Sequence, residues 1–114
     1  MTYQYNAEVI RWVDGDSVWL MVDLGFRMST YTYFRLYGVD TPERGQHGYA
    51  EAKAFVEKVA PEGTKVQIST YKDPDKYGRW LAEVTPLGEF GSIPSVNNQI
   101  INVQLGKTYF GGAR

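Results

Sequence analysis

The chain contains no cysteine and only one histidine, His47, among its 114 residues. Disulfide bonds and thiolate metal sites are therefore excluded, and a zinc site made of the usual nitrogen and sulfur ligands is strongly disfavoured. Any metal ion that binds this protein must be held by oxygen atoms.

A strong excess of positive charge is also missing. The formal net charge is −1 and the sequence pI is about 5.8, whereas a general nucleic-acid-binding domain has a pI above ~9. Attraction to a polyanion would then depend on local groups of arginine and lysine and on a bound divalent cation, because both act at short range.

Long apolar runs are absent too, and no stretch reaches the ~18 uncharged apolar residues of a membrane span. The first residues do not combine a basic region with an apolar run, as a secretory signal would. We therefore expect a cytoplasmic protein with no membrane partner, although secretion stays open if a leader was removed. The length predicts a single domain over residues 1–114, and we expect a monomer.

Alternating apolar and polar residues predict strands. Residues 4–13 and 17–24 flank an Asp14-Gly15-Asp16 turn, and aspartate-glycine between β-branched and aromatic runs is a strong hairpin signal. A third strand over 29–39 would place Arg35 on the same face as Tyr31, Tyr33 and Tyr37.

The remaining chain predicts one clear helix and two more strands. Apolar residues at helical spacing over 50–59, followed by Pro61 and Gly63, favour an amphipathic helix. Residues 65–71 and 79–85 have the pattern of strands, and 97–105 that of a short helix. The predicted fold is α+β and mainly β, a five-stranded Greek-key barrel of the oligonucleotide-binding (OB) type with a helix between the third and fourth strands.

Carboxylates at predicted strand ends form the candidate metal site. Asp16 and Asp40 come from separate segments, and a hard cation such as calcium takes six to eight oxygen ligands, carbonyls and waters included. The Thr41 carbonyl could add a further ligand. Alternatively, both aspartates serve only the local chemistry of turns and loops.

Glu43 is the candidate general base. Hydrolysis needs a group that orients or deprotonates water while cations neutralise the charge that develops on phosphate. Glu43 would equally suit a surface position near the start of a helix, where negative charge is favourable.

Arg35 and Arg79 are the candidate phosphate ligands, because each guanidinium presents a planar fork of donors. As an alternative, Arg35 would stack on a neighbouring tyrosine and Arg79 would form a surface ion pair with Asp73 or Asp75. Nearby Lys76 and Tyr77 could contact a terminal phosphate or be ordinary turn residues.

Three motifs together make the chain similar to the staphylococcal nuclease, or thermonuclease-like, family. They are Val13-Asp14-Gly15-Asp16-Ser17-Val18, Phe34-Arg35-Leu36-Tyr37-Gly38-Val39-Asp40-Thr41-Pro42-Glu43 and Asp75-Lys76-Tyr77-Gly78-Arg79-Trp80-Leu81-Ala82. The resemblance spans about residues 7–106, in the family's order and with family-like spacing. It departs from the secreted prototype in Ser17, which replaces a threonine, and in a shorter, lysine-poor loop over 44–49.

The resemblance implies a calcium-dependent nuclease that hydrolyses DNA and RNA and leaves 3′-phosphate ends. By this likeness, calcium would be held by Asp16, Asp40 and the Thr41 carbonyl, while Glu43 acts on the attacking water. The other implied roles are phosphate clamping by Arg35 and Arg79, support of the metal ligands by Asp14, and substrate contacts by Lys76, Tyr77 and Tyr109.

Two other functions fit parts of the same pattern. A catalytically weak or inactive OB barrel would bind single strands by stacking and electrostatics, and a protein-interaction module would use the tyrosine-rich face. The intact acids and arginines favour the nuclease, with single-stranded DNA or RNA as the preferred substrate. Dependence on calcium would separate the enzyme from both alternatives.

Overall fold

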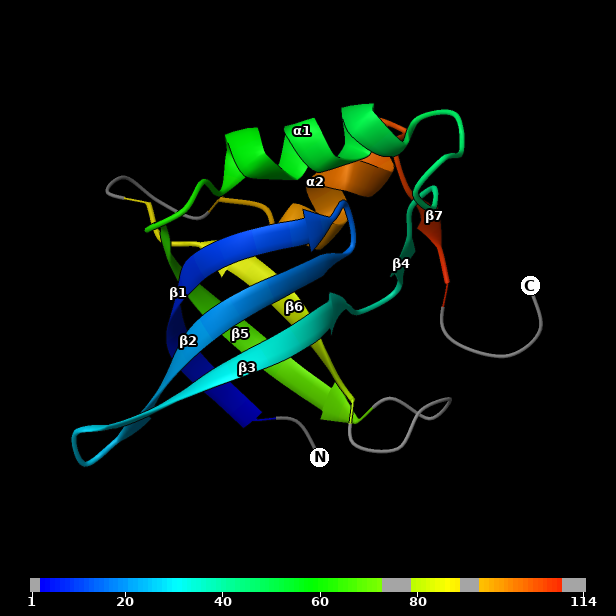
Figure 1. The fold of residues 1–114 in the computed structure, drawn as a ribbon. Coiled ribbons are helices and arrows are strands. Elements are labelled where there is room, and N and C mark those ends of the chain that lie inside the picture. The colour runs from blue at the N-terminus through cyan, green and yellow to red at the C-terminus, as the bar shows by residue number, and fades with distance from the viewer. Residues whose placement is uncertain (1–2, 73–78, 89–92, 110–114) are drawn as a thin grey trace.

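The computed structural model describes residues 3–72, 79–88 and 93–109. Its strands and helices follow the order expected for an OB-type barrel, with two additional very short strands (Figure 1). They are β1 (Tyr3–Asp14), β2 (Ser17–Gly25), β3 (Met28–Leu36), β4 (Val39–Asp40), α1 (Tyr49–Val59), β5 (Lys65–Lys72), β6 (Trp80–Pro86), α2 (Val96–Asn102) and β7 (Lys107–Thr108).

The five longer strands form a closed barrel in the order β1-β2-β3-β6-β5. Strands β1, β2 and β3 are antiparallel neighbours, β5 pairs with β1 and β6, and the parallel pairing of β3 with β6 closes the ring. The predicted OB-type, mainly β fold is therefore confirmed. Closure leaves no long unpaired edge among the five barrel strands.

The β1–β2 hairpin turns where the aspartate-glycine signal predicts it, with Asp14 paired to Ser17. Gly15 in this turn lies against α1. A Cβ atom at this position would be 2.8 Å from the Ala52 Cβ and 3.2 Å from the Thr41 Cγ2 atom. A side chain would thus be too large for this contact between the turn and the helix, which is a structural reason for glycine here.

The predicted third strand over 29–39 is interrupted near its end. Strand β3 ends at Leu36, and the chain turns at Tyr37 and Gly38 before it forms β4. Gly38 has a φ angle of 73°, in the left-handed region that glycine adopts readily. The turn lets β4 leave the barrel and pair with β7 instead, so Asp40 is carried to the side of the barrel end (Figure 1).

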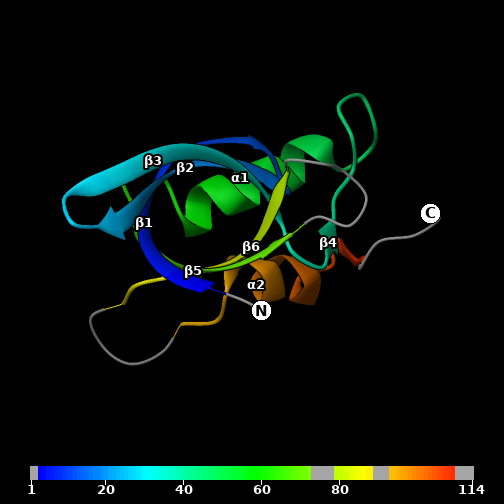
Figure 2. The same ribbon diagram turned by 90° about the horizontal axis from the view of Figure 1, so that it is seen from below.

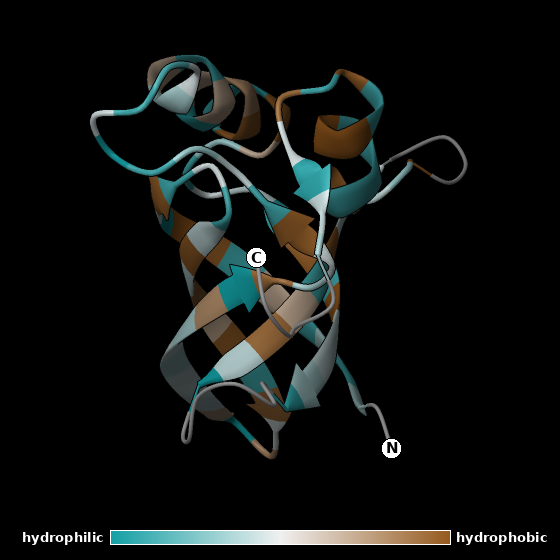
Figure 3. Cartoon of the chain, turned by 90° about the vertical axis from the view of Figure 1, so that its right-hand side faces the viewer, coloured by the Kyte–Doolittle hydropathy of each residue, from teal (hydrophilic) through white to brown (hydrophobic). Residues whose placement is uncertain are grey.

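Both helices cover one end of the barrel (Figure 3). Figure 2 looks along the barrel, and α1 is seen through the ring of strands, lying across the far end. Ala52 and Val56 of α1 and Val96 and Ile100 of α2 are fully buried and belong to the same apolar core as the barrel interior. Side chains of the apolar core therefore fill this end of the barrel, while β4 and β7 pair on its flank.

Helix boundaries differ slightly from the predictions. Helix α1 begins one residue earlier than expected and ends at Val59 as predicted. Helix α2 begins at Val96 behind the capping Ser95, whose hydroxyl accepts a hydrogen bond from the Asn98 amide at 3.1 Å. It ends at Asn102, short of the predicted residue 105. The left-handed Gln104 (φ 63°) marks the exit of the chain from the helix.

Strand β6 also begins later than predicted, at Trp80, so Arg79 precedes the strand. This position leaves the Arg79 side chain beside the end of β3. Within the described residues, no helix is long and apolar enough to cross a membrane.

Candidate functional site

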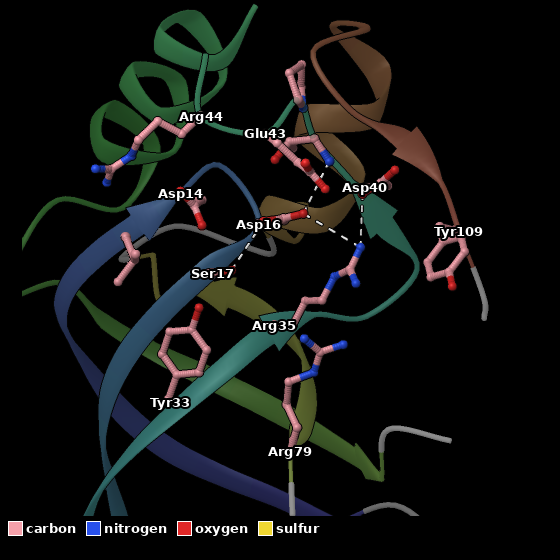
Figure 4. Close-up of a pocket in the computed structure, with 13 residues that line it drawn as sticks. Asp14, Asp16, Ser17, Tyr33, Arg35, Asp40, Glu43, Arg44, Arg79 and Tyr109 are labelled. Atoms are coloured by element: carbon pink, nitrogen blue, oxygen red, sulfur yellow. Dashed lines mark hydrogen bonds and ion pairs between the residues drawn. The ribbon is translucent and has the colours of Figure 1, made fainter. Parts of the chain in front are cut away.

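A pocket of about 740 Å³ opens beside the ends of β1, β3 and β4 (Figure 4). It gathers all the predicted site residues that the structure describes. The lining residues are Val13, Asp14, Asp16, Ser17, Tyr33, Arg35, Asp40, Thr41, Pro42, Glu43, Arg44, Arg79 and Tyr109. Segments separated by up to about 95 positions in the chain thus meet at one polar surface.

Asp16 lies in the β1–β2 turn and is almost completely buried. Its carboxylate accepts hydrogen bonds from the Thr41 amide at 3.2 Å and the Ser17 hydroxyl at 3.2 Å. Burial raises the pKa of Asp16 above its usual value, although the Thr41 amide and the Arg35 charge act in the opposite direction. Further positive charge in the pocket would therefore stabilise the ionised form of Asp16.

Arg35 joins the two predicted metal ligands. Its Nη2 atom lies 3.0 Å from Asp40 Oδ1 and 3.7 Å from Asp16 Oδ2. The residue is 9% exposed, and its guanidinium lies 5.2 Å from the ring centre of Tyr109. The alternative of an exposed arginine stacked on Tyr33 or Tyr37 does not describe this buried arrangement.

The segment that carries Asp40 is held by the C-terminal part of the chain. The buried Asn97 side chain donates to the carbonyls of Tyr37 and Ala82 at 2.8 and 3.1 Å, and it accepts from the Val84 amide at 2.9 Å. The Tyr109 amide donates to the Gly38 carbonyl at 2.9 Å. These contacts fix the turn before β4 and hence the approach of Asp40 to Arg35.

Thr41 is buried between two glycines. Its methyl group lies close to the positions that a Cβ atom would take at Gly15 and Gly106, 3.2 and 3.3 Å away. Its hydroxyl Oγ1 is buried and has no hydrogen-bond partner among the described residues. An orphaned buried oxygen of this kind is uncommon and adds an oxygen acceptor beside the carboxylates.

Glu43 lies on the pocket rim with an exposed side chain, and its amide donates to Gln46 Oε1 at 2.7 Å. It is six positions before α1, whose first turn contains Glu51 instead. A role at the start of that helix therefore does not explain Glu43. In Figure 4 its carboxylate lies close to Asp16.

Arg79 is the second arginine of the pocket. Its guanidinium points toward Arg35 from the other side of the β3 end in Figure 4. The ion-pair alternative for Arg79 involves Asp73 and Asp75, which lie outside the described residues, as do the predicted substrate contacts Lys76 and Tyr77.

Asp14 lies in the β1–β2 hairpin and lines the pocket. It accepts a hydrogen bond from the Tyr49 hydroxyl at 2.8 Å, and this hydroxyl is also 3.2 Å from the Val13 carbonyl. The hydrogen bond to Asp14 is the main reason why the pKa of Tyr49 is raised above 10.0. The first residue of α1 is thereby tied to the β1–β2 turn.

Some contributing residues were not predicted. Tyr33 and Arg44 line the pocket, and Tyr33 has a visible signal because it shares a strand face with Arg35. Asn97 has no comparable signal, since nothing local distinguishes a buried structural asparagine from a helix-capping one.

The oxygen atoms at this site suit a hard cation. Among residues 3–72, 79–88 and 93–109 no group of three or more histidine, cysteine, aspartate or glutamate side chains is arranged as a metal site. Asp16 and Asp40 nevertheless face one arginine, with the Thr41 backbone in contact with Asp16. Two carboxylates fit calcium only if carbonyls and waters complete its coordination.

The fold and the pocket define an OB-type barrel with a mixed carboxylate and arginine cluster on its flank. A family model described as staphylococcal nuclease homologue matches residues 33–109, and the chain belongs to this family. A nuclease-like or nucleic-acid-binding function follows from this membership. The match includes Arg35, Asp40 and Glu43 but begins after Asp16. No curated protein matches the chain significantly.

Proposed function

We propose that this protein is a calcium-dependent nuclease, acting as a monomer, that hydrolyses phosphodiester bonds in DNA and RNA and leaves 3′-phosphate ends. The observation that carries the proposal is the pair of short contacts that Arg35 makes with Asp16 and Asp40, in the same pocket as Glu43. Carboxylates, a general base and a phosphate-binding guanidinium are the groups that metal-assisted hydrolysis requires.

Asp16, Asp40 and the Thr41 carbonyl would hold the calcium ion. Bound there, the ion would supply positive charge that neutralises the phosphate and the developing charge of the reaction. Burial raises the pKa of Asp16, and the buried Thr41 hydroxyl has no hydrogen-bond partner among the described residues; both oxygens would gain from a nearby cation, which supports the proposal.

The side chains would divide the remaining work. Glu43, on the exposed rim, accepts the proton of the attacking water, a step for which an accessible carboxylate is suited. Arg35 and Arg79 bind the phosphate oxygens from two sides, and the fork of each guanidinium orients the group for attack. Asp14 keeps the β1–β2 turn in place through Tyr49.

Substrate contacts would extend beyond the phosphate. Tyr109 stands on the opposite side of Arg35 from the barrel and can contact a nucleotide through its ring. Lys76 and Tyr77 are proposed to contact a second phosphate, by the resemblance of their motif. Single strands are the preferred substrate because their bases can be turned toward aromatic side chains.

The experiment is digestion of single-stranded DNA and RNA with calcium, with excess chelator and with the Glu43→Gln protein, followed by analysis of the product ends. We expect calcium-dependent cleavage to 3′-phosphates and a loss of about a hundredfold or more in Glu43→Gln, as for a lost general base. Glu57→Gln, an equal change on the exposed side of α1, is the matched control.

Two results would contradict the proposal. Equal turnover by wild type and Glu43→Gln would remove Glu43 from the mechanism. A folded protein that binds single strands but does not cleave them with calcium would instead be a non-catalytic binding barrel, and one that binds no nucleic acid would be an interaction module.

A further inference from the structure

Three aromatic rings pack against one another on the outer face of β2 and β3. Trp19 of β2 lies at 4.7 Å from Tyr31, with planes inclined by only 16°, and at 5.1 Å from Tyr33, with an inclination of 55°. We refer to Tyr33, Trp19 and Tyr31 as the aromatic ladder. Its members are cross-strand or diagonal neighbours, since Trp19 pairs with Tyr33 and Met21 pairs with Tyr31.

The aromatic ladder begins at the candidate active site and ends on open surface. Tyr33 lines the pocket, and in Figure 4 its hydroxyl points toward Ser17. Tyr31, at the other end, is 48% exposed. Beyond it the β2–β3 hairpin projects away from the barrel (Figure 1). The aromatic ladder therefore extends from the pocket to a surface outside it.

This surface is unusually apolar for a solvent-facing side of a barrel. Met21, which pairs with Tyr31 on the same face, is 38% exposed. The charged residues of β1 that pair with this face are Arg11, exposed and opposite Trp19, and Glu8, opposite Met21 and ion-paired with Lys65. Stacked rings with a cation at their side form the pattern that binds bases and phosphates together.

The net charge of the chain supplies little affinity for a nucleic acid, so other contacts must supply it. With a net charge of −1, the protein attracts a polyanion only weakly as a whole. Stacking of bases on aromatic rings needs no net charge and accepts every base, because each base has a π face. Affinity for a long strand can therefore come from the aromatic ladder rather than from a general positive surface.

We propose that the aromatic ladder binds unpaired bases of a single-stranded nucleic acid whose scissile phosphate lies in the pocket. The inference rests on the proposed function, which places the scissile phosphate of the nucleic acid in the pocket. Binding of the bases to the aromatic ladder needs no cleavage. Duplex DNA is excluded from the aromatic ladder because its bases are already stacked and paired. The ladder thus selects single strands that extend beyond the pocket by a few nucleotides.

The test is equilibrium binding of fluorescently labelled oligonucleotides, measured by anisotropy in excess chelator so that no cleavage occurs. The probes are thymidine oligonucleotides of about ten residues, a dinucleotide that fills only the pocket, and a duplex of the longer length. The variants are Trp19→Leu, Trp19→Tyr and Tyr31→Leu. The matched control is Tyr3→Leu, an exposed tyrosine of β1 that pairs with Thr70 of β5.

We expect Trp19→Leu and Tyr31→Leu to weaken binding of the long single strand by about tenfold, the contribution of roughly one stacked base. Trp19→Tyr should restore most of the loss because it keeps an aromatic face. Affinity for the dinucleotide and for the duplex should stay within about twofold, and Tyr3→Leu should behave as wild type.

Equal losses for the dinucleotide, the duplex and the long strand would show that the aromatic ladder only braces the β2–β3 hairpin. Unchanged affinity for the long strand, or absence of single-strand binding by wild type, would also overturn the inference. Ladder-dependent binding without calcium-dependent cleavage would leave the inference standing and refute the nuclease, so the two failures are distinguishable.

Discussion

Two segments each bring one aspartate to the pocket, and they are held there in different ways. The β1–β2 turn, residues 14–17, belongs to a hairpin with many paired residues and buries Asp16. The β3–β4 segment, residues 37–41, is outside the barrel and leaves the Asp40 side chain twice as exposed, 26% against 13%. The first segment is held by its hairpin and by α1, through Gly15 and Tyr49, whereas the second depends on α2 and β7.

This difference teaches which contacts the site requires. Two contacts join the segments: the buried Arg35 guanidinium contacts both aspartates, and the Thr41 amide donates to Asp16 Oδ2. The β1–β2 turn would survive changes in the C-terminal third. The β3–β4 segment would not, because Asn97 and Tyr109 supply its hydrogen bonds from that part of the chain.

The largest effect is expected for Arg35→Lys, which replaces the residue that contacts both segments. A lysine keeps the charge but cannot contact both carboxylates and a phosphate with a planar fork, so we expect the rate of cleavage with calcium to fall by about a thousandfold. Initial rates at saturating substrate measure the change. Arg27→Lys at the exposed tip of the β2–β3 hairpin is the control. Lysine at position 35 with wild-type activity would refute the bidentate contact.

Next in size is Asn97→Leu, which removes the hydrogen bonds that join α2 to Tyr37 and to β6. It removes a donor pair and an acceptor from a residue that is 4% exposed, and the unpaired buried groups should cost about 3 kcal/mol in the free energy of unfolding. Chemical denaturation measures this loss. The neighbouring exposed Asn98→Leu is the matched control. An unchanged free energy of unfolding would show that the β3–β4 segment does not depend on the Asn97 hydrogen bonds.

Two glycine substitutions compare the segments directly. A Cβ atom at Gly15 would lie 2.8 Å from the Ala52 Cβ atom, whereas at Gly106 its shortest contact would be 3.1 Å, to the Val39 side chain. We expect Gly15→Ala to destabilise the fold by about 2 kcal/mol and Gly106→Ala by about half of that, as for mild overpacking. Thermal unfolding of both proteins measures the order. The reverse order would place the tighter packing in the β3–β4 segment.

The smallest effect is expected for Tyr49→Phe, which removes the hydrogen bond to Asp14. The pKa of Tyr49 is raised in the folded protein, so the hydrogen bond contributes its full stability below the usual tyrosine pKa of 10.0. The contribution is lost as the pH rises through the folded pKa. Melting temperatures of wild type and Tyr49→Phe should differ slightly at pH 7 and converge above pH ~10. A difference that grows with pH would contradict the assignment.

Much of the barrel follows from local patterns. The aspartate-glycine turn, the alternation of β2 and the amphipathic α1 are each encoded within a few residues, and the structure has them close to the predicted positions. The break of the third strand was missed because Tyr37 and Val39 continue the alternation through Gly38. Only the pairing of β4 with β7 shows that the chain leaves the barrel there.

The sequence by itself determined the membership in the staphylococcal nuclease homologue family, the OB-type barrel and the candidate residues, because turn chemistry, strand periodicity and motif spacing are local properties of the chain. Tertiary structure alone decided that Arg35 contacts Asp16 and Asp40, that Asn97 holds the β3–β4 segment, and that Trp19 packs against two tyrosines. These are contacts between segments that only barrel closure and helix packing bring together, and no local pattern encodes their distances.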